Sequence, residues 1–182
     1  MKTLIINGSP RKNGNTSDLV KLLVENLGGE SVEVSAYHNK ITPCLDCRAC
    51  NKTKGCAIKD DMQKLYDDIY DNVVVASPLY DEDLPGPMIS IKNRFNYVYA
   101  NKRFAKIKNE RKKARGAIIL VGGGDGKPGH AIENAKTILK RMNSKVLDEH
   151  IIKYLNTDEL PALEDEQTVQ RVKDLAHALQ CI

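Results

Sequence analysis

The sequence predicts an α/β fold, a doubly wound sheet of five parallel strands with helices on both faces. Strand and helix patterns alternate about five times along the 182 residues, which is the order that a parallel sheet with crossover helices requires. Residues 73–76 and 117–121 are uninterrupted apolar runs, as in strands that are covered on both faces. A chain of this length fits one domain, so residues 1–182 are expected to form a single unit.

The first strand, the first helix and the second strand form a β-α-β unit. Residues 3–6 are a short apolar strand, and residues 31–36 alternate between apolar and polar side chains as a strand does. Between them a helix is expected from about residue 16 to residue 27, where Gly28 and Gly29 end it. Its apolar stripe consists of Leu19, Leu22, Leu23 and Leu27, widened by Val20 and Val24.

The remaining elements are recognised by helix caps, apolar stripes at helical spacing and continuous apolar runs. In chain order they are a helix capped by Asp60 and Asp61 that runs to about residue 70 with the buried stripe Met62, Leu65 and Ile69, the strand 73–76, a helix that starts near Pro87 with the stripe Met88, Ile91, Phe95 and Val98, the strand 117–121, a helix with Ile132, Ala135, Ile138, Leu139 and Met142, a strand at 145–154 and a helix at 167–179. Three irregular loops, 8–15, 77–87 and 122–129, follow strands at the carboxyl edge, where such sheets bind ligands.

The loop after the first strand reads Gly8-Ser9-Pro10-Arg11-Lys12-Asn13-Gly14-Asn15-Thr16 and leads into a helix, which predicts a phosphate cradle. No Lys-Ser or Lys-Thr follows its last glycine and Gly-x-Gly-x-x-Gly is absent, so nucleotide triphosphatase and dinucleotide motifs are excluded. Asn7 and Gly8 stand where a response-regulator receiver would carry acidic residues for Mg²⁺. A terminal phosphomonoester remains, with neutral donors from Ser9, Asn15 and Thr16 and one cation from Arg11.

With these residues the loop resembles the FMN-phosphate loop of the flavodoxin-like NAD(P)H-dependent FMN reductase family, which includes iron-sulfur flavoproteins. The resemblance extends through residues 44–62, 77–80 and 156–161. It implies one flavodoxin-like FMN-binding domain with strand order 2-1-3-4-5. It also implies the FMN contacts, which are Ser9, Arg11, Asn15 and Thr16 on the phosphate, Pro78, Leu79 and Tyr80 along the isoalloxazine ring, and Gly122, Gly123 and Gly124 leaving room beside the ring.

The chain departs from the family pattern after the tyrosine, where Asp81, Glu82 and Asp83 replace the usual aromatic or small polar residue and glycine. If these carboxylates point inward, their charge disfavours the reduced flavin anion and repels phosphorylated donors. The direction of the three side chains therefore bears on access of a nicotinamide donor.

Four of the five cysteines lie in the irregular loop 37–59, in the pattern Cys44-x-x-Cys47-x-x-Cys50 followed by Cys56. Two-residue spacers allow three thiolates to bind corners of a [4Fe-4S] cluster with Cys56 as the fourth ligand, as in the iron-sulfur flavoproteins that the chain resembles. A structural zinc site is a second alternative, although such sites usually split into two separated pairs. Free thiols that shape a loop over the flavin are the third. Cys181, near the end of the chain, is given no role.

The formal charge of +4 is unevenly spread. Eight basic residues and one acidic residue fall between Lys102 and Arg115, with Phe104 as the only aromatic ring. This pattern favours a solvated segment, or a docking site for an acidic protein or a phosphorylated cofactor, over a nucleic-acid partner. Because there is no charged leader and no run near the ~20 apolar residues of a membrane span, a cytoplasmic protein without a membrane partner is expected.

Three functions follow from the resemblance and the cysteines. The first is an FMN-dependent oxidoreductase that passes reducing equivalents from NADH or NADPH to a quinone, flavin or other small acceptor, with the chemistry carried by FMN rather than by catalytic side chains. The second is an iron-sulfur flavoprotein that relays electrons from a ferredoxin through a [4Fe-4S] cluster and FMN. The third is a non-enzymatic FMN-binding redox carrier or sensor. The resemblance also implies a homodimer or homotetramer.

Overall fold

The computed structural model describes residues 1–66, 69–108 and 110–180. Its centre is a five-stranded sheet in the order β2-β1-β3-β4-β5, in which all neighbouring strands are parallel. The strands are β1 (Lys2–Asn7), β2 (Glu30–Ser35), β3 (Asn72–Pro78), β4 (Ala114–Val121) and β5 (Ser144–Tyr154). The predicted fold class and strand order are confirmed.

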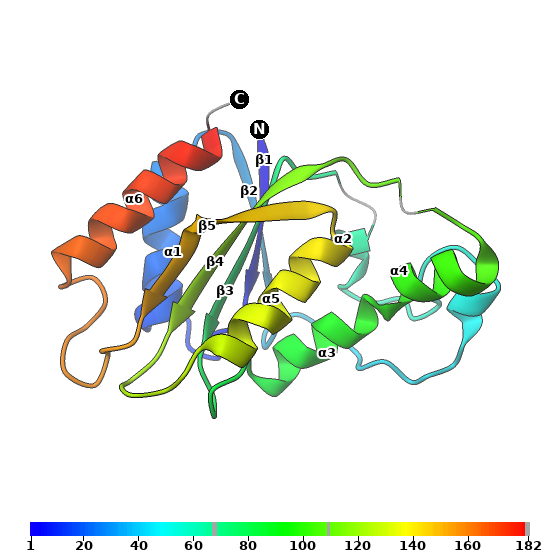
Figure 1. Ribbon diagram of the computed structural model, residues 1–182, viewed down its shortest axis with the longest axis horizontal. Coiled ribbons are helices and arrows are strands. Elements are labelled where there is room, and N and C mark those ends of the chain that lie inside the picture. The colour runs from blue at the N-terminus through cyan, green and yellow to red at the C-terminus, as the bar shows by residue number, and fades with distance from the viewer. Residues whose placement is uncertain (67–68, 109, 181–182) are drawn as a thin grey trace.

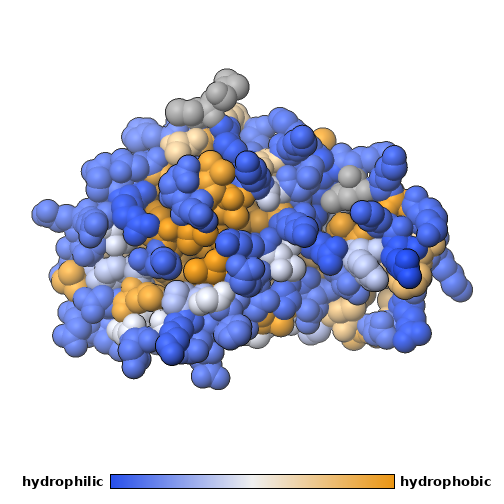
Figure 2. All heavy atoms as spheres, viewed as in Figure 1, coloured by the Kyte–Doolittle hydropathy of each residue, from blue (hydrophilic) through white to orange (hydrophobic). Residues whose placement is uncertain are grey.

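Helices cover both faces of the sheet (Figure 1). On one face α1 (Asn15–Asn26) packs beside α6 (Glu166–Gln180). The other face carries α2 (Gln63–Tyr66), α3 (Gly86–Arg94) and α5 (Gly129–Arg141), and α4 (Asn96–Ala100) follows α3 to the side of the sheet. In the same view, Figure 2 shows hydrophobic residues gathered where β5 lies between α6 and α5, and hydrophilic residues over most of the rest of this face.

Each central strand sends its side chains alternately into two cores. Ile5 of β1 and Ile119 of β4 lie in the core under α1 and α6, whereas Ile6 and Ile118 lie in the core under α3 and α5, and all four are fully buried. Because successive side chains of a strand point to opposite faces, a strand covered on both faces must be apolar throughout. This explains the continuous apolar runs of the sequence.

The helix predicted from Asp60 to residue 70 is shorter in the structure. Met62 and Leu65 are buried as predicted, but α2 spans only Gln63–Tyr66. Ile69 is 67% exposed, so its assignment to the buried stripe was wrong. Residues four positions apart share a face only within a continuous helix. Because the helix ends before Ile69, this side chain does not lie on the same face as Leu65. Residues 67, 68 and Cys181 lie outside the described part of the chain.

The helix predicted to start near Pro87 is divided. Phe95 separates α3 from α4, and a short π-helical turn, η2 (Asn101–Ala105), follows directly. The predicted stripe is nevertheless buried or half-buried, since Met88, Ile91 and Phe95 are fully buried. Within the described residues no helix is both long and apolar enough to cross a bilayer.

Candidate functional site

The three loops at the carboxyl edge of the sheet contact one another. The backbone N–H of Gly8 donates to the carbonyl of Ala76 (2.8 Å), and that of Leu79 donates to the carbonyl of Val121 (2.8 Å). A side chain at Gly8 would lie 2.7 Å from Ser77 Oγ, so the first loop approaches the end of β3 as closely as a glycine allows. The ends of β1, β3 and β4 therefore form one edge, as the strand order requires.

The phosphate loop is held in shape by its own polar groups. The N–H of Ser9 donates to Asn7 Oδ1 (2.9 Å), and the Ser9 hydroxyl both donates to the carbonyl of Arg11 (2.9 Å) and accepts from its N–H (3.2 Å). The hydroxyl of Ser17 also donates to the carbonyl of Arg11 (2.6 Å). These bonds turn the Ser9 side chain toward the loop backbone, so Ser9 sets the shape of the loop.

The loop ends at the N-terminus of α1, where Gly14 is the N-cap and no side chain caps the helix. The first N–H groups of a helix lack intrahelical partners and lie at the positive end of its dipole. Asn15 is oriented by Ala162, whose N–H donates to Asn15 Oδ1 (2.7 Å). Thr16 is buried and Arg11 is exposed. An uncapped helix N-terminus beside a cation is suited to binding a phosphate group.

After Pro78, the chain makes a tight turn from Tyr80 to Asp83. The N–H of Tyr80 donates to the carbonyl of Asp83 (2.9 Å), and the reverse bond is 3.1 Å. Both central residues, Asp81 and Glu82, have positive φ (50° and 63°), which is uncommon outside glycine. Tyr80 itself remains 48% exposed at the edge.

Two of the three acidic residues of this turn are engaged with the neighbouring loop and helix. Asp83 accepts two hydrogen bonds from Nδ2 of Asn134 in α5 (2.7 and 2.9 Å). Glu82 accepts from the N–H of Lys127 (3.3 Å). These two carboxylates tie the turn to the loop 122–129 and to α5.

The glycine loop after β4 packs closely against the chain itself. A side chain at Gly122 would lie 3.2 Å from Leu79 Cδ1, and one at Gly123 would lie 2.5 Å from an Asp158 carboxylate oxygen. At Gly124 the nearest atom would be 4.0 Å away. Residues of the protein itself therefore occupy the space beside Gly122 and Gly123. Only beside Gly124 is there open space.

The segment 154–162, which contains none of the predicted FMN-contact residues, joins the phosphate loop to the glycine loop. The N–H and hydroxyl of Thr157 donate to the carbonyl of Gly122 (both 3.1 Å), and Ala162 holds Asn15 as described above. The hydroxyl of Tyr154 donates to the carbonyl of Leu160 (2.7 Å) and closes this segment on itself. The family resemblance over residues 156–161 was the available signal.

Tyr37, which follows β2 at the carboxyl edge of the sheet, was also not predicted from the sequence. Burial raises the pKa of Tyr37, and the charge of nearby Tyr80 raises it further. The two tyrosines, which follow β2 and β3, therefore lie within electrostatic range of each other. A lone tyrosine in a long irregular loop carries no sequence signal for this placement.

The four clustered cysteines line one cavity of about 340 Å³ at the outer side of α3 and α4. Cys44 and Cys47 are exposed, Cys50 and Cys56 are half-buried, and all four are free thiols. Burial raises the pKa of Cys50, and the charges of the other three cysteines raise it further. The structure thus brings all four predicted ligands to the wall of one cavity.

The cysteine loop is wound tightly around its second thiol. Asp46 and Arg48, on either side of Cys47, both have left-handed backbone conformations (φ 46° and 56°). Such conformations cost non-glycine residues of order 1–3 kcal/mol each and tend to occur at functional sites. The short 3₁₀ turn η1 (Ala49–Asn51) follows and presents Cys50.

A single metal ion is poorly served by this arrangement. Zinc holds each sulfur at about 2.3 Å, so its ligand sulfurs lie about 4 Å apart. Among the residues that the structure describes, no three histidine, cysteine, aspartate or glutamate side chains form a group that could hold a metal ion. The four cysteines that line the cavity are nevertheless the donor set of a [4Fe-4S] cluster, in which each iron takes one cysteine.

A buried ion pair anchors both ends of the cysteine loop. Arg94 at the end of α3 donates from Nη1 to Asp60 Oδ2 (2.7 Å) and from Nη2 to Asp60 Oδ1 (3.2 Å). Its Nη1 and Nη2 also reach the carbonyls of Thr42 (2.6 Å) and Ile58 (3.2 Å). Burial alone would lower the pKa of Arg94, but the hydrogen bonds that Arg94 donates to Asp60 and the nearby negative charges outweigh this effect and raise that pKa.

Asn101 fixes the middle of the same loop. This buried side chain donates from Nδ2 to the carbonyls of Cys50 (2.7 Å) and Thr53 (2.8 Å), and its Oδ1 accepts from the N–H of Gly55 (2.9 Å). Sequence reasoning missed both anchors. The signal for Arg94 was its place in the buried stripe, directly before Phe95 and three residues after Ile91.

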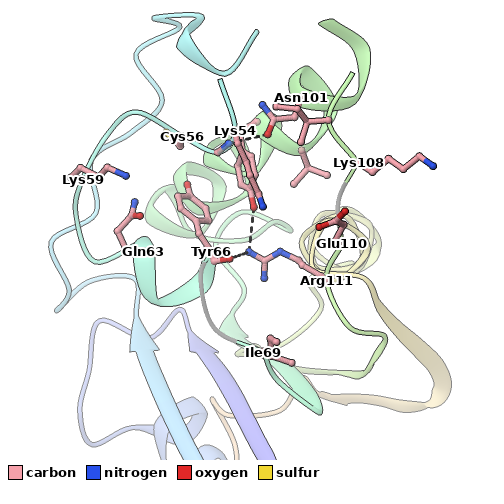
Figure 3. A pocket seen from close by; sticks show the side chains of 14 residues that line it. Lys54, Cys56, Lys59, Gln63, Tyr66, Ile69, Asn101, Lys108, Glu110 and Arg111 are labelled. Atoms are coloured by element: carbon pink, nitrogen blue, oxygen red, sulfur yellow. Dashed lines mark hydrogen bonds between the residues drawn. The ribbon is translucent and has the colours of Figure 1, made fainter. Parts of the chain in front are cut away.

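A second cavity, of about 460 Å³, adjoins the cysteine loop (Figure 3). Cys56 and Tyr97 line both cavities. Arg111 projects into the second cavity and donates from Nη2 to the carbonyl of Tyr66 (2.6 Å) and to the Tyr97 hydroxyl (3.2 Å). The other charged residues of its wall are Lys54, Lys59, Lys108 and Glu110. Part of the basic segment 102–115 thus lies beside Cys56.

The phosphate edge and the cysteine cavity lie toward opposite ends of α3. The helix begins at Gly86, just after the Tyr80 turn, and ends at Arg94 under the cysteine loop. Its nine residues span about 13 Å. The predicted FMN-contact residues and the four cysteines therefore form two separate sites.

The chain is similar to known redox proteins in sequence and in fold. The NADPH-dependent FMN reductase family matches residues 1–154. An iron-sulfur flavoprotein of Methanocaldococcus jannaschii is 32% identical over 139 residues, which are 72% of this chain and 66% of that protein. An iron-sulfur flavoprotein of Archaeoglobus fulgidus is 31% identical over 145 residues, 77% of this chain and 63% of that protein. The matched regions thus span just under two thirds of these relatives.

Solved structures show the same fold at low sequence identity. A flavone reductase gives a TM-score of 0.69 at 18% identity, covering 98% of this chain and 62% of that one. An FMN-dependent NADH-azoreductase from Bacillus anthracis in complex with FMN gives 0.64 at 15% identity, with both chains wholly covered. A flavodoxin from the domain Archaea gives 0.58 at 15% identity, covering 98% and 96%.

Proposed function

The chain belongs to the family of NADPH-dependent FMN reductases, and from this premise we propose that it is an FMN-dependent oxidoreductase. It passes reducing equivalents from NADH or NADPH to a quinone, a flavin or another small acceptor. The observation that carries the proposal is the junction of the β1, β3 and β4 loops beside the uncapped N-terminus of α1. Such a junction at a carboxyl edge is where doubly wound sheets hold a phosphorylated cofactor.

In this proposal Arg11, Asn15, Thr16 and the first N–H groups of α1 bind the FMN phosphate. Ser9 acts mainly by holding the loop, because its hydroxyl is bonded to the backbone of Arg11. The isoalloxazine ring borders the segment Pro78–Tyr80, with space on its other side from Gly124 onward. FMN, when bound, supplies the hydride and electron chemistry, and the protein holds and orients it.

Anaerobic stopped-flow mixing tests the reductase. The FMN-loaded protein is mixed with NADH and, separately, with NADPH while the flavin absorbance near 450 nm is followed. Bleaching by either donor within the turnover time supports the proposal. A flavin that stays oxidised with both donors excludes this reductase and favours a redox carrier or sensor.

A second function is favoured by the cysteine cavity. Cys44, Cys47, Cys50 and Cys56 supply four thiolates around one space, which is the donor set of a [4Fe-4S] cluster. The relatives that match this chain include proteins named iron-sulfur flavoproteins. We therefore propose, as the alternative, that the four cysteines hold such a cluster and that the chain relays electrons from a ferredoxin to FMN and onward.

Metal and sulfide analysis of anaerobically purified protein decides between these functions. About four irons and four sulfides per chain support the relay, whereas flavin without iron removes it and leaves the reductase. We also propose a homodimer or homotetramer, and light scattering after size-exclusion chromatography at micromolar concentration measures the mass. A monomeric mass near the 20.3 kDa of one chain contradicts that assembly.

A further inference from the structure

One buried nitrogen beside the cysteine cavity has no partner in the protein. Four of the contacts that Arg94 makes come from Nη1 and Nη2, while its Nε is buried without a hydrogen bond. It is the only side-chain nitrogen or oxygen in this state among the residues that the structure describes. The side chain of Arg94 has no exposed surface.

An unsatisfied donor of this kind is costly. Leaving one buried N–H without an acceptor destabilises the folded protein, and the effect is larger when the donor is charged. Native proteins avoid such groups, so each one calls for an explanation such as an ion or a ligand. The other polar atoms of Arg94 are all satisfied by Asp60, Thr42 and Ile58, so only Nε is left for an occupant.

Arg94 lies beside the cysteine cavity. Arg94 lines the cavity that the four cysteines surround. The charge of Cys56 contributes to the raised pKa of Arg94, so this thiol and the guanidinium lie within electrostatic range. Tyr66 is the other neighbour, with its ring centroid 5.8 Å from Arg94 Cζ. A sulfur group held by the cysteines is therefore the acceptor that matches both the charge and the place of the donor.

We propose that Arg94 is a positioning residue of the cysteine site and that its Nε–H donates a hydrogen bond to the sulfur of a [4Fe-4S] cluster held by Cys44, Cys47, Cys50 and Cys56. This inference rests on the second function proposed above. Hydrogen bonds to cluster sulfurs are one of the factors that set the reduction potential. A cationic donor stabilises the more negative, reduced state, so Arg94 raises the potential of the cluster.

Arg48 offers a matched control. It is the other arginine that lines the cavity, but its side chain is 74% exposed and pairs with Asp46 at the surface (3.3 Å). Arg94 is instead held from three sides in the interior. A contact between an arginine nitrogen and the cluster is therefore expected from Arg94 and not from Arg48.

The test is pulsed EPR of the dithionite-reduced holoprotein, grown with ¹⁵N-arginine and purified anaerobically with its FMN. We expect a ¹⁵N hyperfine coupling to the cluster in the native protein and in Arg48→Lys, and its loss in Arg94→Lys. The lysine variant keeps the positive charge beside Asp60 but lacks Nε. In a redox titration, Arg94→Lys is expected to shift the cluster potential downward, while Arg48→Lys leaves it unchanged.

The outcomes separate the two proposals. Stoichiometric iron and sulfide without an arginine coupling overturns the role of Arg94 and leaves the cluster in place, as expected if Nε faces only the ring of Tyr66. Protein without iron overturns both this inference and the electron relay, while the FMN reductase is unaffected. If Arg94→Lys fails to fold, the native protein and Arg48→Lys still decide the question. A ¹⁵N coupling that persists in Arg48→Lys supports the role of Arg94, and a coupling that is absent from the native protein or lost in Arg48→Lys overturns it.

Discussion

Arg94 and Asp60 form a bidentate ion pair whose side chains are 0% and 2% exposed, so an interior charge pair joins α3 to the start of α2 beneath the cysteine loop. Buried pairs are seldom a net gain over apolar packing, but removing one partner leaves an uncompensated charge. The stability of this region therefore depends on keeping both charges.

Asp60→Asn is expected to lower the free energy of unfolding by about 3–5 kcal/mol at neutral pH, because the Arg94 cation would lose its counter-charge. Denaturant unfolding at pH 7 measures the change. Asp46→Asn is the control, since it removes the exposed pair with Arg48 and should leave the unfolding midpoint unchanged. Equal effects of the two variants would contradict a special role for the buried pair.

The same pair predicts how stability changes with acid. Burial alone would raise the pKa of Asp60. The hydrogen bonds from Arg94 and from the backbone lower this pKa by more than burial raises it, so the net shift is downward. A depressed folded pKa contributes stability that is complete above the unfolded value of about 3.9 and is lost as the pH falls through the folded value. The difference in unfolding free energy between native protein and Asp60→Asn should thus be constant above about pH 5 and shrink below about pH 4.

Asn101→Ala should loosen the cysteine loop by removing three hydrogen bonds to the segment Cys50–Gly55. The cost is expected to be about 1–3 kcal/mol, because polar backbone groups lose a partner. Hydrogen exchange of the amides in this segment should become faster. Asn93→Ala, at an exposed position of α3, is the matched control, and equally fast exchange in both variants would argue against the anchor.

Arg11→Ala should weaken FMN binding by about 10- to 100-fold, since a hydrogen bond to a charged group is worth about 1.5–3 kcal/mol. Fluorescence titration of apoprotein with FMN gives the Kd, because free FMN is strongly fluorescent. Arg103→Ala removes the same charge at an exposed site of η2 and should leave the Kd unchanged. An unaltered Kd in Arg11→Ala would place the phosphate elsewhere.

Gly123→Ala should destabilise the protein by about 1–3 kcal/mol. The added methyl group would come within 2.6 Å of both Asp158 carboxylate oxygens, so the Asp158 side chain must leave its place beside the glycine loop. Gly126→Ala is the control, because nothing lies within 4 Å of its added methyl group. Thermal unfolding of both variants checks the difference, and a neutral Gly123→Ala would show that Asp158 moves freely.

Local patterns were enough to predict the sheet and the main helices. Ile5 and Ile119 lie in fully apolar runs because their strands are covered on both faces. Such a run consists of consecutive residues, so it can be recognised from the local sequence alone. The short extent of α2 was not predictable in this way, since Leu65 and Ile69 keep helical spacing although the helix ends between them.

The sequence predicted which cysteines form the site, but not which residues hold the cysteine loop in place. Spacing alone grouped Cys44, Cys47, Cys50 and Cys56, whereas the contact of Arg94 with Asp60 joins residues 34 positions apart. Asn101 reaches Cys50 across 51 positions. Such contacts depend on how helices and loops pack in three dimensions, and a single sequence carries no distance information between separate elements.

By joining η2 to the cysteine loop, Asn101 brings together two segments that carry positive charge. Exposed cations of the cysteine loop, of η2 and of the three residues after η2 include Lys52, Lys54, Lys102, Arg103, Lys106 and Lys108. Their combined field accelerates the diffusional approach of negatively charged reaction partners. Mobile ions screen such a field over about 10 Å at 0.1 M salt. Encounter with an anionic electron donor at this end of the molecule should therefore slow steeply as ionic strength rises, whereas a neutral quinone would arrive at the same rate in any buffer.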